Sequence, residues 1–332
     1  MKVLVVGGSR FNGYALVQEL VRFGHEVTVF NRGVTPVDLP PEVRRLYGDR
    51  KNHDQLREVL GNEEFDCVQD MSAYTVDDCQ SILEVLRGRL GHYIFVSSGT
   101  VYGATKLLPI TEESFLQSGL PQREYGTEKI RCERFLFRYG REHGVSVSTA
   151  RISLHMGPRT PTAGREQAMF LRLLQGRPIL IPGDGTAVTH GGHVFDEAKA
   201  LRMMMRQPRT FGEAYNITGK QCCSDESYVD IFAQVVGVEP KKVFVPAAIM
   251  DDVTPTLRWP LIQRLAPEIH GWRASVFLSI QKLHDDVGWE PDFSFPGAVR
   301  QSYEWFLQEG LDKTLAFDFT EEDHLLARIA GQ

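Results

Sequence analysis

Three polar side chains, Ser98, Tyr125 and Lys129, have the types and the spacing that proton and hydride transfer would need. Ser98 follows the apolar run 93–96, which is typical of a buried strand, and a hydroxyl at the carboxyl end of a parallel strand lies in the ligand crevice. Tyr125 and Lys129 are four residues apart at the start of a predicted helix, so both lie on one helix face. We therefore predict that the three side chains meet in one crevice.

Each of the three would have a distinct role when hydride leaves an alcohol carbon. A tyrosine has a pKa of about 10 in water, so a neighbouring cation must favour its phenolate before it can act near neutral pH. We expect Lys129 to supply that charge, Tyr125 to act as general base and acid, and Ser98 to donate a hydrogen bond to the reacting oxygen. A tyrosine and a lysine at this spacing are common in helices, so the hypothesis depends on the other motifs of the chain.

A glycine-rich turn near the amino terminus predicts a site for a dinucleotide cofactor. The branched apolar run 3–6 precedes the turn and an amphipathic segment starts at Tyr14, which is the pattern of a buried parallel strand that leads into a helix. Small residues allow the backbone to approach a pyrophosphate, and free N–H groups at the start of a helix attract its negative charge. The predicted cofactor-binding residues of the turn are Gly7, Gly8, Ser9, Arg10, Phe11, Asn12 and Gly13.

The residues after the next strand-like runs bear on the choice of dinucleotide. Asn31 and Arg32 follow the run 27–30, where the adenosine ribose of a bound dinucleotide would lie. A carboxylate at this point would accept the ribose hydroxyls of NAD, whereas a neutral amide and a cation tolerate the 2′-phosphate of NADP. We predict NADP or NAD with a preference for NADP; the alternative is that Arg32 is a solvated loop charge. Asp49 and Ser72 are further candidate cofactor contacts, although Asp49 could equally be a turn carboxylate.

An alternation of strands and helices must position these residues. It predicts an α/β fold with a Rossmann-type doubly wound parallel sheet over residues 1–155, the NAD(P)-binding domain. The Gly/Pro-rich loop 155–161 ends that region, and a smaller mixed α/β substrate-binding lobe is predicted over 156–332, with later segments free to return to the sheet. The predicted strands are 3–6, 27–30, 46–50 with its turn, 65–70 and 93–99, and the predicted helices are 54–60, 77–90 and 124–143.

The composition argues against several classes of protein. The 332 residues carry a formal net charge of −6 and are 42% hydrophobic, which is usual for a globular protein. An acidic chain argues against nucleic-acid binding, and no apolar stretch reaches the ~20 residues of a membrane helix. The chain opens on a core strand instead of a signal sequence, so we expect a cytoplasmic protein. The five cysteines show no C-x-x-C pair and no zinc-like spacing to histidine, so we expect free thiols and no metal site.

Together these motifs resemble those of the extended short-chain dehydrogenase/reductases, the NAD-dependent epimerase/dehydratase family, over essentially the whole chain. The resemblance implies an NAD(P)-dependent epimerase or ketoreductase that transfers hydride at a hydroxyl-bearing carbon of a sugar or sugar-nucleotide-like substrate. It also implies the Ser-Tyr-Lys set as the catalytic triad, with Lys129 bonded in addition to the cofactor's ribose. The matching motifs are the phosphate loop 7–13, the adenine contact Gly48-Asp49, the serine motif 98–103, and the pair Tyr125 and Lys129.

The resemblance further implies a homodimer, because family members pair two helices across a two-fold axis. The predicted helices 77–90 and 124–143 carry an apolar stripe that suits such an interface, although the same stripe could face the sheet. The residues of the stripe are Cys79, Ile82, Leu83, Leu86, Phe135 and Leu136.

Four features depart from the family pattern. Arg10 replaces a glycine in the middle of the phosphate loop, as in an atypical branch that includes chloroplast stem-loop-binding proteins, and Asn31 replaces an aspartate. Thr189 stands where nucleotide-sugar enzymes have an arginine that clamps the substrate diphosphate, which puts a nucleoside-diphosphate sugar in question. Residues 99–101 contain no carboxylate of the kind that dehydratases use for elimination, so we expect epimerisation or keto reduction.

A different class of function stays open, that of a catalytically idle RNA-binding or regulatory relative with the same fold. The net charge of −6 and the presence of Ser98, Tyr125 and Lys129 favour catalysis. The substrate itself is not identified by the sequence. Candidate contacts for an anionic group, each of which could instead be a solvated charge, are Arg159, Arg165, Arg258 and Arg273.

Overall fold

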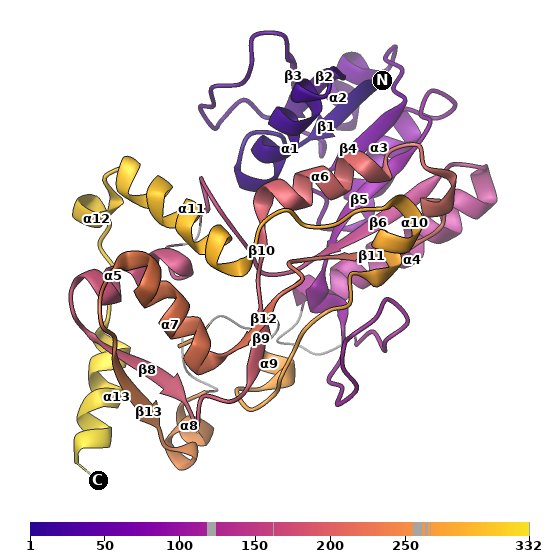
Figure 1. Cartoon of the computed structure of the whole chain (residues 1–332). Helices are drawn as coiled ribbons and strands as arrows, with labels where there is room; N and C mark the ends of the chain where they lie inside the picture. The colour runs from indigo at the N-terminus through magenta and orange to yellow at the C-terminus, as the bar shows by residue number, and fades with distance from the viewer. Residues whose placement is uncertain (118–123, 162, 255–260, 263–264, 266, 332) are drawn as a thin grey trace.

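Seven parallel strands form the central sheet of the larger lobe (Figure 1). The computed structural model describes residues 1–117, 124–161, 163–254, 261–262, 265 and 267–331. The strand order β11-β6-β5-β4-β1-β2-β3 changes direction between β1 and β4, where doubly wound sheets bind ligands. The predicted Rossmann-type α/β fold is therefore confirmed. The strands are β1 (Lys2–Val6), β2 (Glu26–Asn31), β3 (Arg44–Tyr47), β4 (Cys67–Asp70), β5 (Tyr93–Ser98), β6 (Val147–Ile152) and β11 (Ala214–Ile217).

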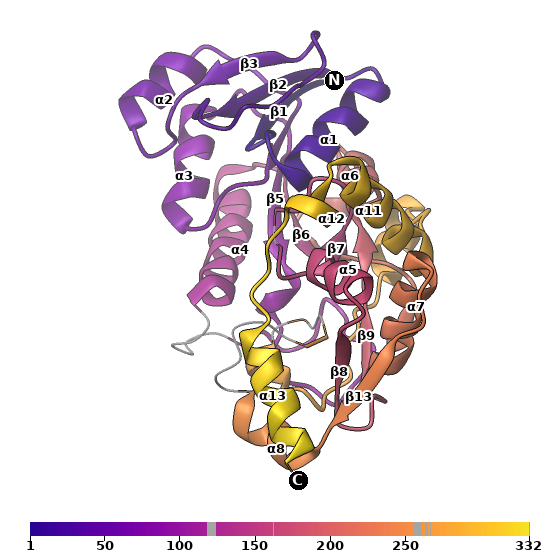
Figure 2. The ribbon, with the colours of Figure 1, turned by 90° about the vertical axis from the view of Figure 1, so that its left-hand side faces the viewer.

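Helices cover both faces of this sheet, because its inner strands are apolar on both sides. In β1, Val3 and Val5 belong to one core and Leu4 and Val6 to the other, since successive side chains of a strand point to opposite faces. This explains why the run 3–6 is uninterrupted. Figure 2 shows the two helical layers on either side of the strands. The first layer contains α1 (Phe11–Arg22) and α6 (Val194–Met204), and the second contains α2 (His53–Leu60), α3 (Val76–Val85) and α4 (Glu124–His143).

The smaller lobe has an aromatic core of its own and holds the carboxyl terminus (Figure 1). The Phe170 ring lies 5.3 Å from the Phe232 ring and 5.4 Å from the Phe306 ring, centroid to centroid. β8 and β13 pair in parallel beside this core. The elements are α5 (Glu166–Leu174), β8 (Pro178–Pro182), α7 (Asp225–Val236), β13 (Lys241–Val245), α8 (Ala247–Val253), α9 (Pro267–His270), α11 (Phe295–Gln308), α12 (Leu311–Thr314) and α13 (Thr320–Ala330).

Segments beyond residue 155 return to the larger lobe. β11 pairs with β6 at the edge of the sheet, α6 joins the first helical layer, and Trp289 is buried in the same core. A domain boundary at residue 155 stays a prediction, because both sides of it contribute to the sheet region. The remaining elements are η1 (Gly99–Val101), η3 (Pro208–Thr210), α10 (Gln281–Val287) and two short pairs, β7 (His155–Met156) with β10 (Gly192–His193) and β9 (Val188–His190) with β12 (Cys222–Ser224).

Two expectations about the helices need correction. The helix predicted over 77–90 ends at Val85, and Gly88 at φ 75° then turns the chain in a conformation that side-chain-bearing residues rarely adopt. The apolar stripe expected at a dimer interface is part of the core instead. A doubly wound fold buries the apolar face of each helix on its own sheet, so these side chains are not available to a partner. Cys79, Ile82, Leu83, Leu86 and Leu136 are buried in the second core, and Phe135 packs against it.

Several features of the described residues bear on the expected class of protein. The five cysteines are free thiols. Across the described helices, none combines the length and the apolar character that a membrane crossing requires. The described part of the chain also holds no group of three or more His, Cys, Asp or Glu side chains that could bind a metal ion.

Candidate active site

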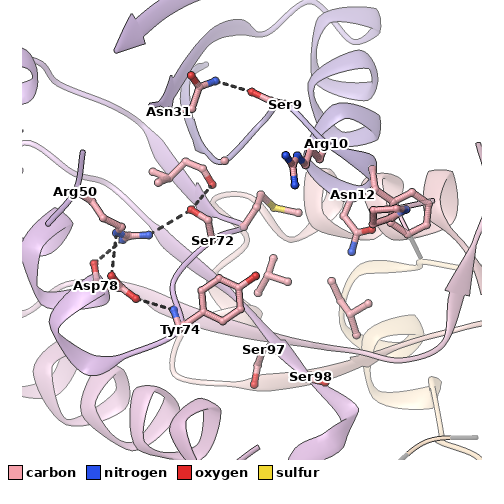
Figure 3. A pocket seen from close by; sticks show the side chains of 18 of the residues that line it. Ser9, Arg10, Asn12, Asn31, Arg50, Ser72, Tyr74, Asp78, Ser97 and Ser98 are labelled. Carbon is pink, nitrogen blue, oxygen red and sulfur yellow. Dashed lines mark hydrogen bonds and ion pairs between the residues drawn. The ribbon is translucent and has the colours of Figure 1, made fainter. Parts of the chain in front are cut away.

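A cavity of about 1060 Å³ at the carboxyl ends of the sheet strands brings the predicted site residues together (Figure 3). Gly8 is the exception: a Cβ on this glycine would lie 3.0 Å from Val17 and from Val29, so Gly8 permits close packing of α1 on β2. The functional roles of the others stay predictions. The predicted residues that line the cavity are Gly7, Ser9, Arg10, Phe11, Asn12, Gly13, Asn31, Arg32, Asp49, Ser72, Ser98, Tyr125 and Lys129.

The turn between β1 and α1 has the shape of a pyrophosphate cradle. Gly7 adopts φ 94° and donates its backbone N–H to Phe30 O at 3.0 Å. A Cβ on Gly13 would lie 2.3 Å from Gly7 O, so any other residue at position 13 would open the turn. Among the described residues no side chain caps α1 at Arg10, which leaves its first N–H groups available to an anion. The residues of the turn therefore fit the pyrophosphate of a dinucleotide.

Asn31 connects this turn to the loop after β2. Its Nδ2 donates to Ser9 Oγ at 2.6 Å, and its Oδ1 accepts the Gly33 N–H at 2.8 Å (Figure 3). The side chain therefore orders two loops of the cavity and places a neutral amide where a carboxylate would repel a 2′-phosphate. Arg10 donates from Nε to Thr35 Oγ1 at 3.2 Å, while Arg32 is exposed beside the same loop.

Asp49 lines the cavity and also makes a local turn. Its Oδ1 accepts the Lys51 N–H at 3.0 Å, and its own N–H donates to Gln55 Oε1 at 2.9 Å. The alternative interpretation of Asp49 as a turn carboxylate is thus correct as far as its contacts within the chain are concerned. Its place in the lining keeps a contact with the cofactor's adenine possible.

The residue after it, Arg50, is one that the sequence analysis missed. Its guanidinium donates to both oxygens of Asp70, at 3.0 and 2.7 Å. It also donates to the backbone oxygen of Asp78 (Figure 3). Asp70 also accepts the Tyr93 hydroxyl at 2.5 Å and the Ser72 N–H at 3.1 Å. Burial would raise the pKa of Asp70, but the charge and hydrogen bonds of Arg50 hold it below its ordinary value. This network ties together the segment after β3, the end of β4, the start of β5 and the start of α3.

Ser98, Tyr125 and Lys129 meet on the other side of β4. Ser98 lies beside Tyr125 and lowers the pKa of its phenol, and Ser98 Oγ accepts the Thr100 N–H at 3.2 Å and the Thr100 hydroxyl at 3.0 Å. Lys129 is only 3% exposed, whereas Tyr125 is 47% exposed at the cavity surface. The Lys129 ammonium donates to Ala73 O at 2.7 Å and to Val96 O at 2.8 Å, and it lies 5.6 Å from the centroid of the Tyr125 ring.

The electrostatics of this set differ from the expectation that Lys129 lowers the pKa of Tyr125. The pKa of Tyr125 is raised, first by burial of the phenol and then by the neighbouring Tyr74, while the hydrogen bond with Ser98 and the charge of Arg165 lower it. Burial also lowers the pKa of Lys129, against the charge of Asp70. Lys129 directs its ammonium at two backbone carbonyls instead of the phenol oxygen. This orientation explains why Lys129 is not the main influence on the pKa of Tyr125.

Residues that follow β6 form what we call the substrate end of the cavity. They are Ser153, Leu154, His155, Pro161 and Arg165, together with Leu265. The acids that line the cavity, Asp49 and Asp78, lie at the opposite end, near β3 and α3.

The four candidate anion contacts separate clearly in the structure. Arg165 lines the cavity, whereas the exposed Arg159 stacks on the Tyr14 ring at 4.0 Å and Arg273 pairs with Asp251. Arg258 lies outside the described residues. Thr189 is buried in β9, opposite Cys223, and is not part of the lining.

Comparison with known proteins gives the geometry a context. The model of the NAD dependent epimerase/dehydratase family matches residues 3–218. The chain is 28% identical to the chloroplast stem-loop binding protein of 41 kDa b of Arabidopsis thaliana, over 98% of this chain and 84% of that protein.

Solved structures share the fold over almost the whole chain. The UDP-glucose 4-epimerase of Thermotoga maritima, solved with UDP-glucose, has a TM-score of 0.75 at 19% identity and covers 93% of this chain and 99% of its own. The dTDP-glucose 4,6-dehydratase of Bacillus anthracis, solved in complex with NAD, has a TM-score of 0.74 at 20% identity and covers 94% of this chain and 98% of its own.

Proposed function

Because this chain belongs to the NAD dependent epimerase/dehydratase family, we propose that it is an NAD(P)-dependent epimerase or ketoreductase acting on a hydroxyl-bearing carbon of a sugar or sugar-nucleotide-like substrate. The observation that carries the proposal is that Ser98, Tyr125 and the buried Lys129 line the same cavity as the glycine-rich turn, with the Lys129 ammonium 5.6 Å from the centroid of the Tyr125 ring. The names of the two solved relatives, an epimerase and a dehydratase of sugar nucleotides, support the substrate class.

In the proposed reaction the chain's own residues hold the substrate oxygen and move its proton. Tyr125 Oη accepts the proton of the substrate hydroxyl and returns it when the carbonyl is reduced. Both Thr100 contacts are donated to Ser98 Oγ, so the Ser98 hydrogen remains for the Tyr125 phenol and, when substrate binds, for the reacting oxygen. Lys129 keeps a positive charge beneath the site and would also bond the cofactor's ribose. A bound nicotinamide would supply the hydride acceptor.

Epimerisation or keto reduction suits the cavity better than elimination does. Elimination from a sugar needs an acid close to the reacting carbon. In the described lining the acids are Asp49 and Asp78, both at the cofactor end, and Asp78 already accepts the backbone N–H groups of Tyr74 and Thr75. The short helix η1, which follows Ser98, brings Thr100 to the cavity instead of a carboxylate.

NAD dependence is the property of the family, and we propose in addition that this chain prefers NADP(H). The neutral Asn31 amide and the cationic Arg32 line the part of the cavity that follows β2. Among the described residues Arg32 has no hydrogen-bonding partner within the chain, so its charge is available to a 2′-phosphate.

The other predictions about the protein's setting are not tested by the structure. A homodimer stays a prediction, and it would have to use surfaces other than the buried stripe of α3 and α4. A cytoplasmic location also stays a prediction, and one relative is named as chloroplastic. An idle RNA-binding relative is not favoured, because the chain has a net charge of −6 and retains Ser98, Tyr125 and Lys129 in one cavity.

The experiment that tests the proposed function removes the phenol oxygen of Tyr125. We expect Tyr125→Phe to bind NAD(H) as the parent does and to lower turnover by roughly 10²- to 10⁴-fold, the usual contribution of a positioned acid and base. The cofactor retained by the purified protein identifies the redox partner, and hydride transfer is followed by nicotinamide absorbance over a panel of sugars and sugar nucleotides.

Tyr303→Phe is the matched control, because Tyr303 stacks in the core of the smaller lobe, away from the cavity. This variant should turn over as the parent does. Parental turnover in Tyr125→Phe would contradict the proposed function.

A further inference from the structure

Arg165 is a cation at the substrate end that does not itself hold the substrate oxygen or move its proton in the proposed reaction. It immediately precedes α5, is half-buried, and lines the same cavity as Ser98 and Tyr125. Its charge acts on the Tyr125 phenol and on His155. A positive group therefore stands close to the place where a substrate hydroxyl would lose its proton.

Within the described chain the Arg165 guanidinium makes no hydrogen bond and no ion pair. Buried arginines elsewhere in the described chain are ion-paired: Arg50 pairs with Asp70 at 2.7 Å, and Arg151 pairs with Glu133 at 2.7 Å. A guanidinium that is partly removed from water and left unpaired is unfavourable, so such a group is normally compensated by an anion. In this case no carboxylate of the described chain pairs with the guanidinium, which leaves a ligand to do so.

The groups around Arg165 neutralise it only in part. Glu166, the next residue, is buried, and burial raises its pKa to about 7 against the charge of Arg165, so its carboxyl is only partly ionised at neutral pH. His155 is buried and uncharged at neutral pH, since burial lowers its pKa to about 3. The Lys129 ammonium is committed to two backbone carbonyls. Leu154 and Leu265 add apolar walls.

The described substrate end offers one free guanidinium and therefore matches one anionic group. Thr189 is buried away from the cavity, and the exposed Arg273 is paired with Asp251. A guanidinium forks onto a carboxylate or a phosphate with two parallel hydrogen bonds, whereas a nucleoside diphosphate carries more charge than one such contact matches.

We infer that Arg165 forms an anion subsite, and that the substrate is a sugar carrying a single carboxylate or phosphate monoester near the carbon that is oxidised. This inference rests on the proposed function and makes it more specific. Arg165 holds the anionic group, the apolar walls exclude water around it, and Ser98 and Tyr125 then face the neighbouring hydroxyl.

The test measures binding to the full-length protein saturated with NAD. Isothermal titration calorimetry compares glucose, glucuronate, glucose 6-phosphate and UDP-glucose. We expect glucuronate or glucose 6-phosphate to bind roughly 10- to 100-fold more tightly than glucose, the effect of one charge-assisted contact. The tighter of the two shows whether the anion is a carboxylate or a phosphate.

Three variants complete the experiment. Arg165→Gln should remove the tighter binding of the anionic hexoses and leave NAD affinity and the melting temperature unchanged. Arg165→Lys should retain part of that tighter binding. Arg159→Gln, which changes a neighbouring exposed arginine, should retain all of it.

The inference is overturned if the anionic hexoses bind no more tightly than glucose, or if none of the hexoses binds. It is also overturned if the anionic hexoses still bind more tightly than glucose in Arg165→Gln. UDP-glucose that binds best and is insensitive to Arg165→Gln would also overturn it. These outcomes leave the proposed function standing, because that function fails only if Tyr125→Phe retains the parent's turnover.

Discussion

The ionisation of Tyr125 is set by the side chains around it more than by its own type. Burial and the Tyr74 phenol raise its pKa, and the hydrogen bond with Ser98 and the charge of Arg165 lower it. Lys129, which also faces the ring, is bonded to backbone oxygens instead. Because these influences oppose one another, single substitutions can move the pKa in either direction.

We predict that Ser98→Ala and Tyr74→Phe shift the pH profile of alcohol oxidation in opposite directions. The phenolate accepts the proton, so kcat/KM for oxidation rises with pH until Tyr125 is ionised. Ser98→Ala removes an influence that lowers the pKa of Tyr125 and should move the rising limb to higher pH. Tyr74→Phe removes an influence that raises the pKa of Tyr125 and should move the rising limb to lower pH. Profiles of kcat/KM against pH measure both shifts, and a shift of both variants in the same direction would show that the limb belongs to another group.

At the scale of elements, the loop after β2 and the turn after β1 act as one unit in choosing the cofactor. Asn31 joins them by its bonds to Ser9 and Gly33, and Arg32 extends from the same loop into the cavity. A 2′-phosphate carries a charge of about −1.5 to −2 near neutral pH, so a change of charge at either position acts on NADP and hardly on NAD.

We predict that the parent binds NADP(H) at least as tightly as NAD(H). Arg32→Ala should weaken NADP(H) roughly tenfold and leave NAD(H) unchanged, and Asn31→Asp should reverse the preference. Titration of both dinucleotides by calorimetry measures these affinities. Arg45→Ala, an exposed arginine on β3 outside the lining, controls for the loss of one positive charge. Tighter NAD(H) in the parent with no effect of Arg32→Ala would show that Arg32 is a solvated loop residue.

The stability of the whole molecule toward acid depends on buried histidines in both lobes. His92 accepts the Arg206 N–H at 3.1 Å and bonds the Ser148 hydroxyl at 2.8 Å. The other buried histidines, His155, His190 and His193, lie in the short strand pairs. Two buried acids have the opposite tendency, since burial raises the pKa of Glu166 to about 7 and the pKa of Glu197. Burial lowers the pKa of His92, His155 and His193 to about 3 and that of His190 to about 4.

We predict that the free energy of unfolding begins to fall as the pH drops below about 6.5 and falls more steeply below about pH 4.5. Histidines in the unfolded chain bind protons below about pH 6.5, before the folded ones do, so acid favours unfolding. Glu166 and Glu197 bind protons first in the folded chain, which offsets two of the four histidine protons until the unfolded glutamates are protonated near pH 4.5. Below that point each histidine contributes a slope of about 1.4 kcal/mol per pH unit.

Urea unfolding over this range of pH checks the prediction. His92→Gln should make the slope below about pH 5 shallower by one proton, whereas His324→Gln, an exposed histidine, should not change it. A slope that is the same in His92→Gln and in the parent would mean that His92 does not contribute to the acid sensitivity.

The parts of this protein that sequence alone determined are those carried by local spacing. The run 3–6, the turn 7–13 and the alternation of strands and helices predict the β1–α1 cradle. A strand and a helix are recognised by the spacing of their apolar residues, and the turn is recognised by its glycines. The four-residue interval between Tyr125 and Lys129 likewise places both on one face of α4, and both line the cavity.

Only the tertiary structure decided what those residues touch. Arg50 meets Asp70 and Asp78, which are 20 and 28 residues further along the chain, and Lys129 turns its ammonium to Val96 O, so its expected effect on Tyr125 is lost. The stripe that includes Ile82 faces the sheet instead of a partner. Side-chain periodicity states that a helix has an apolar face but not what covers it, and desolvation and charge depend on neighbours that are distant in sequence.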